Sequence, residues 1–211
     1  MKNVKITWLG HACFEISGGG YTVVTDPFED GSVNGIGNVR TEANAVYCSH
    51  SHHDHNAVDC VALKQTDAQP PIVSEISTFH DGENGAKRGA NTVRVFDFDG
   101  VRVGHFGDLG HALSEEQIKE IGKLDAALMP VGGFYTIDAE TAKTVFDKLG
   151  AKIMIPMHYR TDDFGFPVIA HIDDVVKALG DVTATNSSEL TVGEDTRPGI
   201  YVLTPKLMQK K

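Results

Sequence analysis

Alternation between apolar and polar residues predicts a β-rich N-terminal part. The three segments that show this alternation lie at residues 4–8, 14–16 and 21–25. Three consecutive glycines at residues 18–20 predict the turn between the second and third segments. A loop is expected over residues 30–44, and a further strand is expected at residues 46–48. The chain is therefore predicted to begin as a series of short strands.

The rest of the chain alternates between strand and helix patterns. Its expected strands lie at residues 91–98, 101–105, 126–129 and 152–156. Ser114 and Gln117 have the spacing of a capping box, which predicts the start of a helix. Asp138 can cap a second helix that Gly150 ends, and a third helix is expected at residues 173–179. Strands followed by helices in both halves indicate two packed sheets with helices outside.

Composition narrows the class of protein without identifying it. The chain has 211 residues, 41% of them hydrophobic, and no low-complexity linker, so we expect one domain over residues 1–211. A formal net charge of -10 argues against nucleic acid or anionic lipid as partners, and no apolar run reaches transmembrane length. The N-terminus leads directly into a strand pattern rather than a signal peptide, and Cys13, Cys48 and Cys60 lack paired spacing. We therefore expect a cytoplasmic protein without nucleic-acid or membrane partners, and its oligomeric state is not specified.

The strongest chemical signal is the segment 50–55, which reads His-Ser-His-His-Asp-His. Because alternate side chains of an extended backbone share a face, His50 and His52 can hold one ion together. If the backbone then turns into a helix, Asp54 and His55 project from its first turn towards a second ion. Imidazole and carboxylate suit zinc, iron and manganese. The alternative is a solvated histidine tract or a purification tag, but a tag would lie at a terminus and would lack the carboxylate.

Three further places can complete a binuclear site. His80 follows an expected strand, and His158 ends the expected strand that precedes it. Asp108 lies between two glycines after another expected strand, where its carboxylate could bridge two ions. Each signal is weak alone, because Gly-Asp-x-Gly is a common turn, but together and in this order they are strong. The histidines that compete with His80 as the third ligand of the first ion are His11, His105 and His111.

This ordered set of residues resembles the metallo-β-lactamase fold superfamily. The segments that extend the resemblance beyond the ligands lie at residues 8–11, 24–28, 107–108, 129–133 and 156–159. The chain is most similar to the small stand-alone metal-dependent hydrolases related to ascorbate-6-phosphate lactonases. The resemblance covers roughly residues 4–180. It implies an α/β protein of layered type, an αββα sandwich of two mixed β-sheets with helices outside and the site at one edge.

The resemblance also implies a role for each predicted ligand. The first metal would be held by His50, His52 and His80. The second metal would be held by Asp54, His55 and His158, with Asp108 as the bridge. His80 is preferred over its competitors because Thr78-Phe79-His80 resembles the strand-end ligand of the family. His105 and His111 are then expected to orient a ligand from behind, and His53 is expected to face solvent.

The expected function is that of a metal-dependent hydrolase with two divalent ions. Zinc is the default, and manganese and iron accept the same ligands. Two such ions can share a water and lower its pKa to near neutrality, so a metal-bridging hydroxide would cleave an ester, lactone, amide or phosphoester. Asp54 is the expected catalytic residue, because it can accept a hydrogen bond from that hydroxide.

The expected partner is a small-molecule substrate, and anionic or phosphorylated molecules are among the candidates. Candidate contacts are the loop at residues 132–135 and Arg160, although a plain surface role for Arg160 is equally open. The glycine-rich segment at residues 82–89 is either a flap over the site or a surface loop.

Two other function classes compete with hydrolysis. The fold also hosts iron oxidoreductases such as persulfide dioxygenases, which keep a mononuclear site. A non-catalytic module with structural metals is disfavoured, because structural zinc usually has four closed ligands rich in cysteine. Metal content and redox activity separate the first class from a hydrolase. Loss of hydrolytic turnover in a His52→Ala variant would exclude the second.

Overall fold

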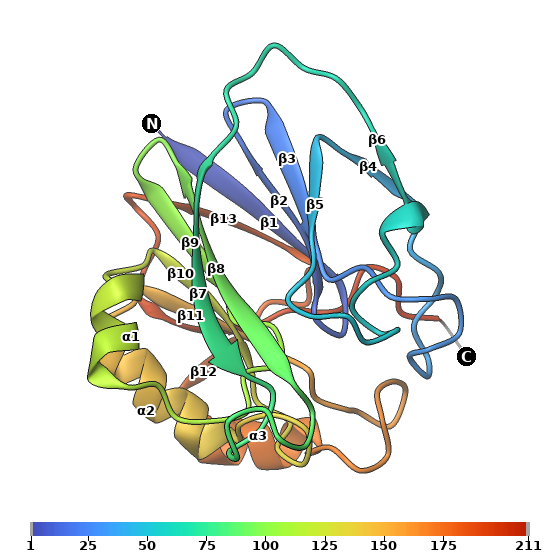
Figure 1. Cartoon of the computed structure of the whole chain (residues 1–211), viewed down its shortest axis with the longest axis vertical. Coiled ribbons are helices and arrows are strands. Elements are labelled where there is room, and N and C mark those ends of the chain that lie inside the picture. Colours follow the sequence, from blue (N-terminus) through green and yellow to red (C-terminus); the bar gives the residue numbers. More distant parts are fainter. Residues whose placement is uncertain (1, 210–211) are drawn as a thin grey trace.

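Two mixed β-sheets stacked face to face form the body of the protein (Figure 1). The computed structural model describes residues 2–209. Residues 1, 210 and 211, which the single-domain prediction includes, lie outside the described residues. The predicted αββα sandwich is confirmed.

The first sheet comes mainly from the N-terminal part of the chain. Its strands, in spatial order, are β13 (Glu189–Gly193), β1 (Asn3–Gly10), β2 (Cys13–Gly18), β3 (Tyr21–Thr25) and β5 (Ala45–Tyr47). All pairs are antiparallel except β3 and β5, which run parallel. The parallel pair directs the end of β5, and the histidine-rich segment after it, to the same edge as the end of β3.

The second sheet has seven strands. In spatial order they are β12 (Val182–Ala184), β14 (Gly199–Val202), β11 (Ile153–Met157), β10 (Ala126–Pro130), β9 (Val101–His105), β8 (Ala90–Phe98) and β7 (Ile72–Phe79). The strands from β12 to β9 are parallel, whereas β7, β8 and β9 pair antiparallel. Every residue of β10 and β11 is buried, as expected for central parallel strands.

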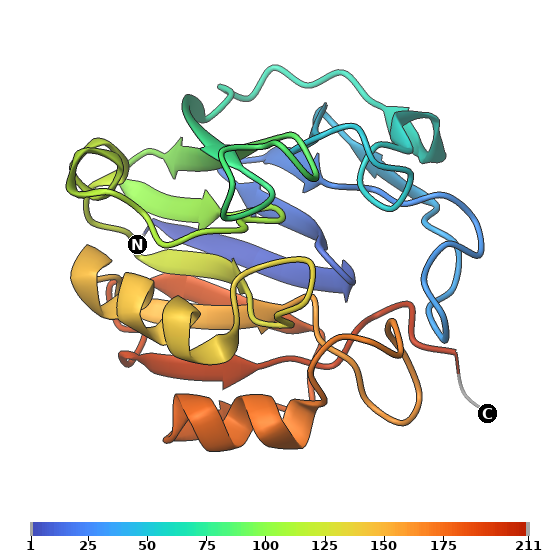
Figure 2. The same cartoon turned by 60° about the horizontal axis from the view of Figure 1, so that its bottom comes forward.

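Three α-helices lie together beside the seven-stranded sheet (Figure 2). They are α1 (Glu115–Ile121), α2 (Ala139–Leu149) and α3 (Ile172–Leu179). Ser114 and Gln117 form the predicted capping box of α1, Asp138 caps α2, and Gly150 ends α2 in the left-handed conformation. None of the described helices has the length and apolar character needed to cross a membrane.

The core between the sheets also fixes the turn after β1, which contains His11. Trp8 is fully buried, and its ring lies against Phe14, Tyr159 and Phe164 at centroid distances of 6.3, 5.4 and 5.9 Å. Its indole N–H donates a hydrogen bond to the carbonyl oxygen of His11 at 3.0 Å. The largest core side chain therefore anchors the turn that follows β1.

Two local predictions are wrong. Residues 50–55 form turns rather than a helix, because their backbone is tied to the loop after β3: the N–H of Glu29 donates to the His53 carbonyl. The predicted loop over residues 30–44 contains β4 (Thr41–Ala43), which pairs in parallel with β6 (Val61–Leu63) just after a 3₁₀ turn (Val58–Cys60). Both differences arise from contacts between segments that are distant in the sequence.

Candidate metal centre

All seven predicted metal ligands lie together at one edge of the sandwich. The segments that carry them and their neighbours follow the ends of six strands: His11 after β1, Asp26 after β3, residues 50–55 after β5, His80 after β7, Asp108 after β9 and His158 after β11. Side chains from the carboxyl ends of neighbouring strands meet at such an edge, which is where open α/β sheets bind ligands.

One group consists of His50, His52 and His80, whose ligand atoms all lie within 4.8 Å of one another. His50 Nε2 is 3.0 Å from His52 Nδ1. The backbone N–H of His80 donates to the Gly89 carbonyl at 3.0 Å, which fixes the end of β7. Three nitrogens at this spacing can hold one metal ion.

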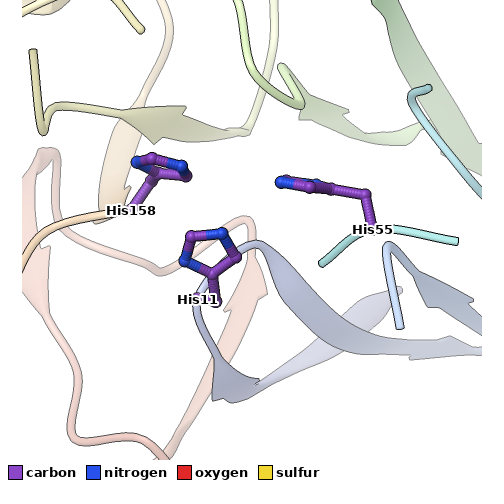
Figure 3. A group of neighbouring side chains, drawn as sticks. All are labelled: His11, His55 and His158. Atoms are coloured by element: carbon purple, nitrogen blue, oxygen red, sulfur yellow. The ribbon is translucent and has the colours of Figure 1, made fainter. Parts of the chain in front are cut away.

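A second group consists of His11, His55 and His158, again with ligand atoms within 4.8 Å of one another. All three side chains are buried, and they converge from three separate segments (Figure 3). Here the prediction missed His11, which was considered only as a competitor for the first group. Its signals in the sequence are its place after Gly10, where β1 ends, and the resemblance of residues 8–11 to the family.

Asp108 lies between the two groups. Its Oδ1 is 3.3 Å from His55 Nε2, and its Oδ2 is 3.2 Å from His80 Nε2 and 3.4 Å from His158 Nε2. Burial opposes ionisation of this carboxyl, but His158 and His55 outweigh burial and hold its pKa well below the ordinary value. An ionised carboxylate whose oxygens lie close to histidines of both groups has the geometry of a bridge.

Asp54 lies on the side of the second group. Its Oδ2 is 3.3 Å from His11 Nε2 and 3.7 Å from His55 Nε2. Burial raises the pKa of Asp54, but the close contact with His11 and the charge of His55 outweigh it, so the pKa is lowered. Asp54 is therefore ionised at neutral pH.

Asp26 supports both groups from behind and was not predicted as a site residue. This fully buried carboxylate accepts hydrogen bonds from His55 Nδ1 at 2.8 Å and from the Ser49 hydroxyl at 2.6 Å. The hydroxyl oxygen of Ser49 is in turn 2.9 Å from His50 Nδ1, which can donate to it. Asp26 thereby orients His55 directly and His50 through Ser49, and the Nε2 atom of each ring is directed at the other ligands of the site.

The histidines differ in proton affinity. Burial and the charge of His55 lower the pKa of His50 to about 3, and burial and the charge of His158 lower that of His11 to about 4. Burial also disfavours the charged form of His55, but Asp108 and Asp26 outweigh it and raise its pKa well above the ordinary value. Without metal, these shifts favour the neutral forms of His50 and His11 and the protonated form of His55 at pH 7.

Comparison with known sequences decides the family. Residues 5–158 match the family described as Beta-lactamase superfamily domain. The chain belongs to the metallo-β-lactamase superfamily. Among its relatives, the UPF0173 metal-dependent hydrolase of Methanoculleus marisnigri is 27% identical, over 93% of this chain and 97% of the relative. The UPF0173 metal-dependent hydrolase of Thermoplasma volcanium is 30% identical, over 76% of this chain and 86% of the relative.

Solved structures agree with the sequence relatives. A Thermotoga maritima protein, assigned as a Zn-dependent hydrolase of the metallo-β-lactamase superfamily, is 34% identical with a TM-score of 0.73. The match covers 95% of this chain and 98% of that chain. The resemblance to small metal-dependent hydrolases of the metallo-β-lactamase superfamily, predicted from the ligand pattern, is therefore confirmed.

The remaining predicted residues of this metallo-β-lactamase superfamily member lie around the two groups. The Nε2–H of His105 donates a hydrogen bond to the Ala12 carbonyl at 2.8 Å, and so His105 holds the turn that contains His11. His111 Nε2 accepts a hydrogen bond from the N–H of Phe79 at 3.2 Å, next to His80. His53 is exposed. The Nε of Arg160 donates to the Ile169 carbonyl at 3.1 Å.

A cavity of about 370 Å³ opens onto the two groups. Its lining residues are His52, His53, Asp54, His80, Arg88, Asp108, Tyr135, His158 and Phe166. This volume is within the range of small-molecule sites in proteins. The predicted contact loop at residues 132–135 contributes Tyr135 to the wall, whereas Arg160 is not among the lining residues.

Proposed function

We propose that this protein is a binuclear metal-dependent hydrolase that cleaves an ester, lactone, amide or phosphoester of a small molecule. The observation that carries the proposal is the position of Asp108, a buried carboxylate whose two oxygens lie between two three-histidine groups. Structural zinc sites have four closed ligands, so this larger set with an adjoining cavity favours catalysis.

The buried polar atoms of the site fit bound cations. Asp108 Oδ1 and His55 Nε2 are both buried and form no hydrogen bond, although they are only 3.3 Å apart. A buried polar atom without a partner costs about 1–3 kcal/mol, so such atoms rarely persist without a function. A metal ion between them would satisfy both.

We assign the ligands as the sequence predicts. His50, His52 and His80 would hold the first ion, and Asp54, His55 and His158 would hold the second, with Asp108 shared. His11 lies beside Asp54 and would either orient it or add a nitrogen to the second ion. Zinc is the first candidate, and manganese and iron accept the same imidazole and carboxylate donors.

The chemistry follows from the positions of the side chains. Two bound divalent ions would activate water and polarise the carbonyl or phosphoryl oxygen under attack. Asp54 lines the cavity and is ionised, so its carboxylate can accept a hydrogen bond from the attacking water and orient it. His11 holds Asp54 from the buried side and keeps the carboxylate directed at the cavity.

The test is metal content by mass spectrometry on protein purified without a metal-affinity column, beside esterase, lactonase and phosphodiesterase screens. About two zinc or manganese ions per chain, with hydrolysis that a chelator removes, is the expected result. A single iron per chain with redox activity and no hydrolysis would favour an oxidoreductase. Metal without any turnover would favour a binding module.

Metal binding at pH 7 should release about one proton per chain, because His55 must lose its proton to ligate. The raised pKa of His55 means that protons compete with metal below that pKa, so apparent affinity rises with pH until His55 is deprotonated. Titration calorimetry in buffers of different ionisation enthalpy measures the released proton. A binding enthalpy that is independent of the buffer would contradict the assignment.

Asp26→Asn should weaken metal binding and hydrolysis about 10- to 100-fold, the usual cost of losing a carboxylate behind metal-bound histidines. Because Asp26 orients His55 and, through Ser49, His50, both ions should be affected. Asp30→Asn is the matched control, since Asp30 is an exposed residue of the same loop that pairs with Arg40. Loss of only one ion in Asp26→Asn would limit its role to one group.

We also propose a cytoplasmic location and a small-molecule rather than nucleic-acid substrate. Cys13, Cys48 and Cys60 are free thiols, which is typical of reducing compartments. The net charge of -10 disfavours a polyanion as substrate.

A further inference from the structure

Arg88 occupies a position in the cavity wall that metal chemistry does not explain. It is the one lysine or arginine among the described residues that line the cavity. Its guanidinium lies over the Tyr135 ring, with Cζ 5.5 Å from the ring centroid. Arg40 and Arg94 each pair with a carboxylate, but no described carboxylate lies within ion-pair distance of Arg88.

The loop that carries Arg88 is fixed by hydrogen bonds. The buried carboxylate of Asp81 accepts four backbone N–H bonds, from Glu83, Gly85, Lys87 and Arg88, at 2.8, 2.9, 3.0 and 2.7 Å. Asp81 directly follows His80, so this network links the backbone of Arg88 to a predicted metal ligand. The segment at residues 82–89 is therefore an ordered wall of the site.

The wall beside Arg88 is aromatic. Tyr135 and Phe166 face each other edge to face at a centroid distance of 6.2 Å, and both line the cavity. Such rings bind apolar or planar parts of a ligand. The cavity thus offers metal ligands, an apolar wall and an unpaired guanidinium.

The negative net charge of the protein suggests a role for the unpaired guanidinium of Arg88 in binding an anionic group. A protein with a net charge of -10 repels anions over most of its surface, so a guanidinium in the cavity wall adds local attraction for an anionic group beside that of the proposed metal ions. A planar guanidinium binds carboxylate and phosphate through two parallel hydrogen bonds. We infer that Arg88 binds a carboxylate or phosphate group of the substrate, remote from the bond that is cleaved, while Tyr135 and Phe166 contact the apolar part between them.

This inference rests on the proposed hydrolase function for its biological meaning, but binding can be measured without turnover. Hexanoate and adipate have chains of equal length and differ only in the remote carboxylate, and 6-phosphonohexanoate carries a phosphonate one methylene farther from the shared carboxylate. Calorimetry with the metal-containing protein should show that adipate, 6-phosphonohexanoate or both bind about 10- to 100-fold more tightly than hexanoate. The anion preferred indicates which group the substrate carries.

Arg88→Gln should abolish the preference for the second anionic group and leave hexanoate binding unchanged. Arg88→Lys should retain part of the preference, because it keeps the charge but loses the paired hydrogen bonds. Lys87→Gln is the matched control, since Lys87 is the neighbouring cation but pairs with Glu83 at the surface, and it should bind all three ligands as the wild type does. Thermal melting and metal content establish that each variant is folded and loaded.

The outcomes distinguish a failure of the proposed role of Arg88 from a failure of the proposed hydrolase function. The role of Arg88 would be overturned if Arg88→Gln preferred adipate and 6-phosphonohexanoate over hexanoate as strongly as the wild type does. This holds even if the protein hydrolyses esters. No preference in the wild type would overturn it as well. A preference that depends on Arg88, in a protein that hydrolyses nothing in the screens, would support this anion site and contradict the hydrolase.

Discussion

Asp108→Ala should reduce hydrolysis by a factor on the order of 10³ or more and lower the bound metal to about one ion per chain or fewer. The reason is that Asp108 is the carboxylate that contacts histidines of both groups, His80 in the first and His55 and His158 in the second. Without it, neither group would have its shared oxygen donor, and the two proposed ions would lose the ligand that keeps them close together. Steady-state kinetics and metal analysis of the same preparation measure both effects.

A carboxylate of the same type elsewhere provides the control for Asp108→Ala. Asp59 is exposed, lies in the 3₁₀ turn shortly after the histidine-rich segment, and is not part of either group. Asp59→Asn should therefore keep wild-type metal content and activity. Asp108→Ala protein that retains both ions and most of its activity would show that Asp108 only balances the charge of the buried histidines.

Much of the fold could be predicted from the sequence because its elements carry local signals. The capping box at Ser114 and the glycine stop at Gly150 mark helices whose ends depend on neighbouring residues alone. β4 could not be predicted, because three residues form a strand there only by pairing with β6. For the same reason β13, which completes the first sheet beside β1, was not predicted.

The candidate site, like the fold, could be predicted from the sequence only in part. Seven candidate ligands could be predicted because metal chemistry restricts the residue types and because their order resembles that of the metallo-β-lactamase superfamily. The structure brings all seven together, while metal binding itself stays a prediction. The roles of His11 and Asp26 could not be predicted, because they arise from contacts with Asp54 and His55 that no local pattern specifies. In the sequence, each is a polar residue at a strand end, within a segment that extends the family resemblance but assigns the residue no role.

Gly110→Ala should destabilise the protein by about 1–3 kcal/mol, the usual cost of overpacking, because its added methyl group has no space. A Cβ at Gly110 would lie 2.2 Å from the backbone nitrogen of Asp81 and 2.3 Å from the carbonyl carbon of His80. Backbone atoms cannot rotate away, and the N–H of Gly110 also donates to the Phe79 carbonyl at 2.9 Å. The turn that carries Asp108 must therefore move away from the strand end that carries His80.

The movement of this turn should also lower the rate of hydrolysis, since a displacement of about 1 Å in a catalytic site can cost on the order of 10² in rate. We expect Gly110→Ala to lower both the melting temperature and kcat/KM, and to weaken the first ion most, because the 3.2 Å contact between Asp108 and His80 opens. Gly82→Ala is the control: Gly82 lies two residues after His80, and its added Cβ would meet no atom within 4 Å. If the two variants behave alike, the close approach at Gly110 does not set the position of His80. If only Gly110→Ala loses stability and activity, packing between two ligand-bearing segments requires the second glycine of the Gly-Asp-x-Gly turn. This would explain why a common turn sequence is needed at this place.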